Sequence, residues 1–251
     1  MTSLICRDEK SALYSLSKIL GISEIKLVDY LTDDIQIQYE NSSSTKYIDF
    51  PTYLFKKIID VYHITALRKI DQIHWFHGTR IWKGSKIKNE GILPTNLIVP
   101  KLVEQINTLA FMNDIEKNKF SPKKYPFLDK IHTEMHWGPY GNLNRVAVAH
   151  PNLFGFHSYI DMPEIVEDYI QYAFYDNYSN LVSIYKKMTR SAIIEFITTP
   201  KNDNYQWLIE PILLFLYCSM HKEGYSIYCN VCYDGFAVPI TPSQILKIEY
   251  L

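Results

Sequence analysis

Short strand-like and helix-like segments alternate from Ile73 to the end of the chain, and this alternation restricts the chain to a mixed fold. Residues 73–77 and 191–198 are apolar and rich in β-branched or aromatic side chains, which predicts strands. The apolar residues 211–223 are followed by Gly224, which predicts a helix that ends there. We therefore predict an α+β fold with mainly antiparallel strands. Further β structure is predicted over 225–232, 235–239 and 245–250.

The composition excludes several classes of protein. With 251 residues, of which 47% are hydrophobic, the chain can bury a sizeable core and is not intrinsically disordered. The net charge of −1 excludes a cationic surface over the whole molecule. No apolar stretch approaches the roughly 20 residues of a membrane span, and the N-terminus lacks the apolar region of a secretory signal. With four cysteines, we expect a cytoplasmic protein, and secretion as an effector by another route stays open.

The first 65 residues are predicted to form a small unit of helices and a hairpin, separate from a domain over 66–251. Apolar side chains at helical spacing predict two short helices within 8–34 and a third over 51–62. Between them, residues 35–48 alternate apolar and polar side chains around a turn of Asn and Ser residues. This alternation predicts a hairpin.

The first two helices are similar to a helix-turn-helix motif. Gly21 is suited to end the first helix, and Ser23 is suited to cap the second. The second helix carries Lys26 but also Glu24 and Asp29, whose carboxylates repel DNA phosphates. A helical hairpin packed on the main domain is therefore favoured over DNA binding.

The most informative motif is WFHGTRIWKGSKIKNEGILP, residues 75–94. A strand delivers His77, Gly78 and Thr79, and a short helix follows that ends before Gly91. A histidine at the end of a strand can exchange a hydrogen bond with a ribose hydroxyl, and glycine allows close approach of a ligand to the backbone. The peptide groups of Gly78 could pair with a planar carboxamide, and Thr79 adds a hydroxyl. The motif therefore indicates a nucleotide site.

This segment resembles the first motif of the ADP-ribosyltransferase superfamily, in the diphtheria-toxin and poly(ADP-ribose) polymerase branch of His-Tyr-Glu type. The resemblance covers residues 73–251, interrupted by an insertion over about 95–150. It implies a split antiparallel β-sheet core with helices, and NAD+ as co-substrate bound by His77 and its neighbours. Nicotinamide would leave, and ADP-ribose would pass to an acceptor. Arg80 could bind the diphosphate of NAD+, because a guanidinium pairs well with phosphate. A surface salt bridge is an equally good explanation of Arg80.

Residues 155–171, GFHSYIDMPEIVEDYIQ, resemble the second motif of the family. Two strands are expected within 145–159. Asp161 is then expected to cap a helix, with Glu164 completing a capping box. In the family, aromatic rings enclose the nicotinamide, which suits a flat cationic ring. The matching positions are Ser158 or Tyr159 and, on the helix, Tyr169.

The third family motif is a carboxylate, normally Glu, at a late strand. It helps an oxocarbenium-like transition state to form at the anomeric carbon. The matching position holds Asp234, whose side chain is one methylene shorter. Glu210 is the alternative catalytic carboxylate. It could equally be an ordinary acidic residue near the N-terminus of a helix, where a negative charge is stabilising. A chain without a working carboxylate would be a degenerate or differently tuned enzyme.

Four potential zinc ligands lie close together near the C-terminus. The spacing Cys-x2-Cys is typical of zinc sites. However, the seven residues between the first pair of ligands and the second make a short spacer. In addition, residues i and i+3 of a strand face opposite sides, so the two cysteines of the second pair would point apart. Buried free cysteines are therefore the default, no metal is predicted, and zinc stays an alternative. The four residues are Cys218, His221, Cys229 and Cys232.

Residues 95–150 contain a predicted helix near 99–115 and then a basic patch. The patch favours a nucleic acid over a protein as the macromolecular acceptor. We expect an ADP-ribosyltransferase that serves as a bacterial toxin, antiphage defence protein or effector, with an antitoxin or other partner protein left open. The alternatives are an inactive NAD- or nucleic-acid-binding module of the same fold and an enzyme similar to RNA 2′-phosphotransferases. The patch consists of Lys117, Lys119, Lys123 and Lys124.

Overall fold

The computed structural model describes residues 1–41, 48–85, 87–118 and 126–251. They form two compact units, and each unit is assembled from separate segments of the chain. The expected boundary at residue 65 differs from this division, because later segments join the N-terminal residues in one core. The first unit combines Met1–Phe76, Asn142–Phe156 and Ile197–Cys232, and the second combines His77–Gly141, His157–Phe196 and Tyr233–Leu251.

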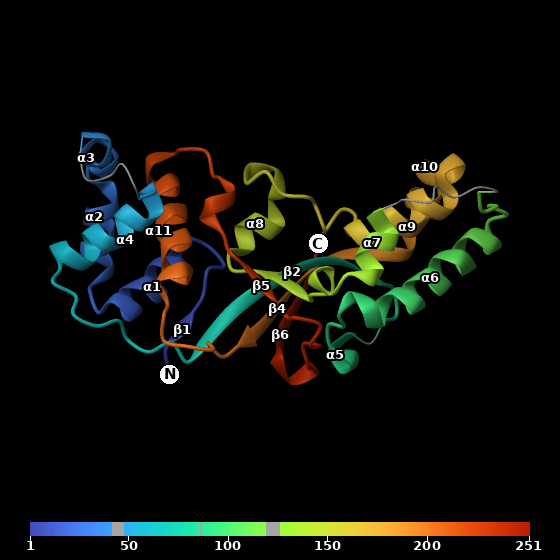
Figure 1. Cartoon of the computed structure of the whole chain (residues 1–251), viewed down its shortest axis with the longest axis horizontal. Coiled ribbons are helices and arrows are strands. Elements are labelled where there is room, and N and C mark those ends of the chain that lie inside the picture. Colours follow the sequence, from blue (N-terminus) through green and yellow to red (C-terminus); the bar gives the residue numbers. More distant parts are fainter. Residues whose placement is uncertain (42–47, 86, 119–125) are drawn as a thin grey trace. The chain divides into compact units, whose positions relative to one another are not determined.

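The first unit is built around the helix α11 (Gln206–His221), which contacts three N-terminal helices (Figure 1). Its side chains from Ile212 to Cys218 are all buried, so α11 is apolar on almost every side. A helix of this kind is stable only when other elements cover it. The predicted helix over 211–223 is confirmed, but it begins five residues earlier than expected, and it ends at His221 with Lys222 as the C-cap instead of Gly224. The three covering helices are α1 (Glu9–Leu20), α2 (Glu24–Thr32) and α4 (Phe50–Val61).

The predicted boundary between α1 and α2 is confirmed. Gly21 ends α1 with a φ of 73°, in the left-handed region where glycine carries no side-chain penalty. Ser23 caps α2, and its hydroxyl oxygen accepts the N–H of Lys26 at 3.2 Å.

The hairpin predicted over 35–48 is wrong in its first strand, because Ile35–Asn41 form the helix α3. Glutamine and glutamate alternate with the apolar residues here, and both are good helix formers. The ring of Tyr39 lies 5.3 Å from that of Phe50 at the start of α4, so packing supports the helix. The expected turn and the start of the second strand, 42–47, lie outside the described residues.

The strands predicted near 73–77, 191–198 and 245–250 are confirmed, as is the α+β class. The strands follow the order β5-β3-β2-β4-β6, with β1 beside β2. β2 is antiparallel to β3, β4 is antiparallel to β6, and β1 is parallel to β2. Their bounds are β1 (Ser3–Leu4), β2 (Gln72–Trp82), β3 (Tyr140–Asn142), β4 (Thr189–Thr198), β5 (Cys232–Asp234) and β6 (Ile245–Tyr250).

The two strands expected within 145–159 are wrong. Arg145–Ala149 form the helix α8, and a 3-10 helix follows over Pro151–Leu153. Asn144 caps α8, because its side-chain oxygen accepts the N–H of Val146 at 2.9 Å. The cap satisfies a backbone donor at the helix start, which apolar periodicity did not reveal.

The β structure expected over 225–239 is mostly wrong. It contains a 3-10 helix, Ile227–Cys229, before the short strand β5. The N–H groups of Gly235 and Ala237 then donate to the carbonyls of Pro139 and Gly138, at 3.0 and 2.7 Å. Loop-to-loop bonds therefore replace a regular ladder over this stretch.

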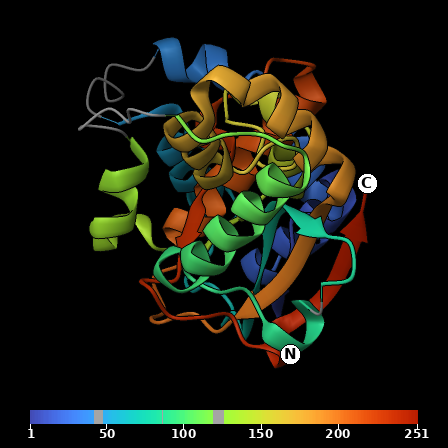
Figure 2. The same cartoon turned by 90° about the vertical axis from the view of Figure 1, so that its right-hand side faces the viewer.

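The second unit has a helical core formed by α6, α7, α9 and α10 (Figures 1 and 2). Ile106, Ile170 and Leu181 are fully buried in it. The helix predicted near 99–115 is confirmed as α6. No helix in the described part of the chain is long and apolar enough to cross a membrane. The helices are α5 (Ile87–Glu90), α6 (Thr95–Met112), α7 (Pro126–His132), α9 (Glu164–Phe174) and α10 (Tyr178–Met188).

Candidate functional site

The second unit contains a cavity of about 650 Å³. The end of β2, from His77 to Trp82, forms one part of its wall. One face of α6 forms another, where lining residues recur every three or four positions. The segment before β3 and the start of α9 complete the wall with Tyr140, Tyr159 and Glu164. A volume of this size lies within the range of roughly 300 to 1,000 Å³ that is typical of small-molecule sites.

Gly91 forms the turn that follows α5, and the chain lines the cavity from this turn onward. Its φ is 82°, and an added Cβ would lie 2.2 Å from the carbonyl oxygen of Ile240. The next residue, Ile92, exchanges two backbone hydrogen bonds with Ile240, at 2.9 and 3.0 Å. The glycine that the sequence identified as a helix stop therefore also fixes a loop of the cavity.

His77 lines the cavity and keeps one ring nitrogen for a ligand. Its Nδ1 lies 2.7 Å from the carbonyl oxygen of Tyr140. A carbonyl can only accept, so Nδ1 carries the proton. Burial lowers the pKa of His77, although the bond to the Tyr140 carbonyl acts in the opposite direction. The imidazole is therefore neutral near pH 7, and its Nε2 is left as an acceptor.

Glu164 is the acidic residue at the start of α9 and lies in the cavity wall. Its Oε1 is 2.6 Å from Nζ of Lys130, and its Oε2 accepts the hydroxyl of Tyr159 at 3.0 Å. Lys130 is shared with Asp168, also at 2.6 Å. Burial alone would raise the pKa of Glu164, but the bonds and charge of Lys130 outweigh it and lower that pKa. The carboxylate is therefore held ionised beside a tyrosine ring.

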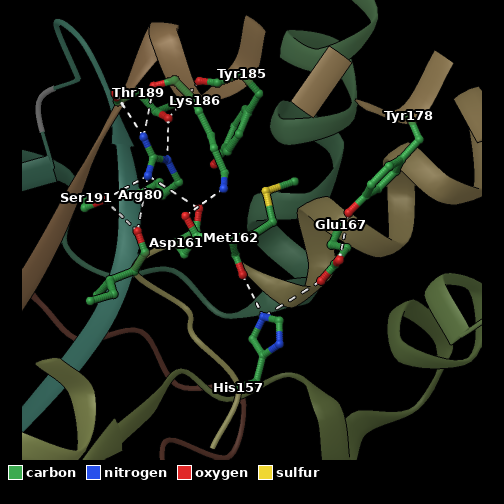
Figure 3. Close-up of polar contacts among 11 residues, drawn as sticks. Arg80, His157, Asp161, Met162, Glu167, Tyr178, Tyr185, Lys186, Thr189 and Ser191 are labelled. Carbon is green, nitrogen blue, oxygen red and sulfur yellow. Dashed lines mark hydrogen bonds and ion pairs between the residues drawn. The ribbon is translucent and has the colours of Figure 1, made fainter. Parts of the chain in front are cut away.

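Arg80 lines the cavity, but its guanidinium is bound to the protein itself (Figure 3). Nε donates to the hydroxyl of Thr189, and Nη1 donates to the hydroxyl of Ser191, each at 2.8 Å. Nη2 donates to the carbonyl of Lys186 at 2.9 Å, at the end of α10. Arginine has five N–H donors, and acceptors of this protein surround all of its nitrogens. The geometry does not favour the expected contact with a diphosphate.

The aromatic residues of the second motif do not come together at the cavity. Tyr159 is in the wall, in a loop rather than the expected strand. Tyr169 is buried in the helical core, and its hydroxyl donates to Asn107 of α6 at 2.7 Å. The backbone carbonyl of Ser158 accepts the N–H groups of Asp161 and Met162, which shapes the loop around Tyr159. The second tyrosine in the wall is instead Tyr140, of β3.

The two carboxylates proposed from the third motif lie outside the cavity wall. Asp234 ends β5 and accepts the N–H of Phe236 at 2.8 Å. It is near Tyr140, because its charge adds to burial in raising the pKa of that tyrosine. Glu210 belongs to α11 in the first unit, where it accepts the side-chain amide of Gln206 at 2.7 Å.

Sequence reasoning missed Glu164 and Lys130 as site residues. Glu164 was interpreted as part of a capping box, but the residue before α9 is Pro163 and provides no side-chain cap. The expected cap, Asp161, instead pairs with Lys186 at 2.6 Å. The tyrosine five residues before Glu164 was the available signal, because a turn between them can bring the two side chains together.

The potential zinc ligands of the C-terminal segment are engaged elsewhere. Cys218 and Cys229 are buried and contact one another, and hydrogen bonding to Cys218 lowers the pKa of Cys229 to about 7. The Nε2 atom of His221 lies 2.8 Å from the carbonyl oxygen of Leu31. Among the described residues, no group of three His, Cys, Asp or Glu side chains is placed to hold a metal ion.

Comparison of the chain with protein-family models, with curated proteins and with solved structures gives no match.

Proposed function

We propose that the cavity of the second unit binds NAD+ and that the protein transfers ADP-ribose to a macromolecular acceptor. One observation carries the proposal: the His-Gly-Thr segment, two tyrosines and an ionised glutamate line the same cavity. The proposal includes a split β-sheet core of the ADP-ribosyltransferase type. The residues concerned are His77, Gly78, Thr79, Tyr140, Tyr159 and Glu164.

The residues of the wall suit successive parts of NAD+. The Nε2 atom of neutral His77 can accept a ribose hydroxyl, and the backbone of Gly78 can pair with the carboxamide. The ring of Tyr159 can stack on the cationic nicotinamide. In the reaction, the bond between the anomeric carbon and the nicotinamide nitrogen breaks, and nicotinamide leaves with the electron pair. The acceptor then forms a bond to that carbon and releases a proton.

Glu164 is the carboxylate that best suits the developing positive charge. A fixed anion beside the anomeric carbon stabilises an oxocarbenium-like transition state. Glu164 lies in the wall and is held ionised, whereas Asp234 is near Tyr140 but does not line the cavity. We therefore place Glu164 before Asp234 and Glu210 as the acidic residue of the reaction.

The test is NAD+ turnover by the purified protein, with labelled NAD+ and either cell lysate or nucleic acid as acceptor. His77→Ala should abolish turnover, and Glu164→Gln should lower kcat on the order of 10²-fold or more. Asp234→Asn and Glu210→Gln are the matched controls for loss of a carboxylate. Retention of full activity by Glu164→Gln, with loss in Asp234→Asn, would return the role to Asp234.

The two tyrosines of the second motif provide a second matched pair. Tyr159→Ala removes a ring from the cavity wall and should weaken NAD+ binding by about tenfold, the equivalent of about 1.4 kcal/mol. Tyr169→Phe removes only a hydroxyl from the helical core and should leave NAD+ affinity unchanged. The reverse pattern in a binding titration would contradict this assignment of the cavity.

A binding module without turnover is the second candidate. The observation in its favour is that Lys130 neutralises part of the charge of Glu164, and Lys101 pairs with the other acid of the wall, Glu90, at 2.9 Å. Affinity for NAD+ without release of nicotinamide would support this module. An activity similar to RNA 2′-phosphotransferases is less well supported, because Arg80 is already bound to the protein.

The acceptor is proposed to be a nucleic acid or a protein, in the setting of a toxin, defence protein or effector. Lys117, at the start of the predicted basic patch, is exposed. The remaining lysines of the patch, Lys119, Lys123 and Lys124, lie outside the described residues. Transfer of label to nucleic acid or to protein in the lysate assay separates the two acceptor classes.

A further inference from the structure

We propose that Arg80 is a positioning residue that holds the loop 157–163, and with it Tyr159 and Glu164, in place at the cavity. The loop has no regular secondary structure, yet it carries two wall residues, Tyr159 and Pro163, and leads directly into a third, Glu164. The assignment of a ligand to these residues rests on the proposed function, whereas the link between Arg80 and the loop does not.

Arg80 joins three elements of the second unit to the loop (Figure 3). It projects from β2 and binds the end of α10 and the start of β4 through Lys186, Thr189 and Ser191. Its Nη1 also lies 3.3 Å from the carbonyl oxygen of Ile160 and 3.4 Å from that of Asp161. Both carbonyls belong to the loop, so the guanidinium connects it to β2, α10 and β4.

Ser191 strengthens the same connection. Its hydroxyl accepts from Arg80 at 2.8 Å and donates to the carbonyl of Ile160 at 2.6 Å. On the outer side, Lys186 pairs with the carboxylate of Asp161 at 2.6 Å. Hydrogen bonds from Asp161 and Met162 to the carbonyl of Ser158 shape the loop internally. The internal bonds define the shape of the loop, and Arg80 and Ser191 fix the loop relative to β2 and β4.

The position of the loop determines the position of the wall residues. Tyr159 directly precedes Ile160, and Glu164 follows Asp161 by three residues. A shift of the two carbonyls would therefore move a ring and a carboxylate that line the cavity. A displacement of about 1 Å at a reacting centre can cost on the order of 10²-fold in rate. Lysine cannot replace Arg80, because an ammonium group cannot reach acceptors that a planar fork spans.

The first test measures hydrogen exchange of peptides that cover 157–164. Arg80→Met and Arg80→Lys should exchange there at least about tenfold faster than wild type, as expected when local opening becomes easier. The matched control is Arg190→Met, the same substitution at an exposed residue of β4. Ser191→Ala loosens the loop from the other side and serves if the Arg80 variants do not fold. Unchanged exchange over 157–164 in a folded Arg80 or Ser191 variant would overturn the proposal.

The second test separates positioning from direct phosphate binding. Nicotinamide, which lacks phosphate, and ADP-ribose, which carries a diphosphate, are titrated separately and monitored by NMR. Arg80→Lys should lower affinity for nicotinamide by about tenfold, the equivalent of about 1.4 kcal/mol, and change ADP-ribose affinity less. Selective loss of ADP-ribose binding would assign Arg80 to the diphosphate and overturn the proposal. If wild type binds neither compound, the proposed function fails, and hydrogen exchange still decides the role of Arg80.

Discussion

His77 and Arg80 lie three residues apart in β2 and use their polar atoms in opposite ways. Arg80 is surrounded by acceptors of its own protein, whereas the side chain of His77 bonds, within the described part of the chain, to the carbonyl of Tyr140. The residue type suggested a ligand contact for both. The difference comes from the folded positions of their partners. Tyr140 leaves Nε2 of His77 available as an acceptor, whereas Thr189 and Ser191 occupy N–H donors of Arg80.

The half-buried imidazole of His77 predicts a pH-dependent stability. Burial lowers its pKa in the folded protein, whereas the unfolded chain has the ordinary pKa of about 6.5. As the pH falls below about 6.5, the unfolded chain binds a proton that the folded chain does not, so the free energy of unfolding decreases. The contribution of neutral His77 to the unfolding free energy is thus fully present above about pH 6.5. It is lost as the pH falls towards the lower pKa that His77 has in the folded protein.

Denaturant unfolding between pH 7.5 and 5 measures this effect. The difference in unfolding free energy between wild type and His77→Gln should shrink as the pH falls, because the variant lacks the titrating group. His132→Gln, at an exposed histidine, is the control for loss of an imidazole. A difference that stays constant across this pH range would contradict a neutral, half-buried His77.

At the scale of elements, the acidic residues at the start of α9 bind lysines of neighbouring helices instead of capping α9. Asp161 pairs with Lys186 instead of capping α9, and Glu164 pairs with Lys130. The pattern that predicted a capping box was correct that a helix follows, but it placed the start two residues too early, because Pro163 and not Asp161 precedes α9. It was wrong about the bonds, because partners on α7 and α10 bind these carboxylates.

The turn after α5 gives a prediction that separates backbone strain from a steric clash. Gly84 and Gly91 both have positive φ, 89° and 82°, but an added Cβ at Gly84 meets no atom of the described residues within 4 Å. Gly84→Ala should therefore cost about 1 to 2 kcal/mol from left-handed backbone alone. Gly91→Ala should cost more, about 3 kcal/mol, because the carbonyl of Ile240 must move away and its bond to Ile92 weakens.

Denaturant unfolding of the two glycine variants checks the ranking. Equal destabilisation of both would show that the Ile240 carbonyl moves at no cost. Gly91→Ala should also reduce ligand binding, since Gly91 and Ile92 line the cavity.

At the scale of the whole molecule, each unit combines segments that are distant in sequence. The first unit joins residues 1–76 with α11. The chain passes from the first unit into the second in the middle of β2, and it returns to the first unit near the end of β4. A segment that appears independent in the sequence, such as 1–65, is therefore part of a larger core. Its helices cover the apolar α11.

Deletion of residues 1–65 should therefore produce an aggregating protein. Removal of α1, α2 and α4 exposes the buried side chains of α11, and apolar patches larger than roughly 400 Å² promote association. Size-exclusion chromatography and dye binding of the 66–251 fragment measure this, with the full chain as control. A soluble, monomeric fragment that unfolds cooperatively would support the boundary at residue 65 instead.

Features that depend on near neighbours in the chain were predictable from the amino-acid sequence. Gly21 and Ser23 mark the ends of helices through bonds within one turn, and apolar periodicity identified α6, β4 and β6. The His-Gly-Thr segment was also recognisable, because its residues are adjacent.

Which polar side chains face the cavity depends instead on contacts between distant segments. Arg80 binds residues more than 100 positions away, Tyr169 bonds to Asn107, and Glu164 bonds to Lys130. Local sequence patterns contain no information about such partners. Whether a side chain meets a ligand or its own protein depends on the packing of distant segments.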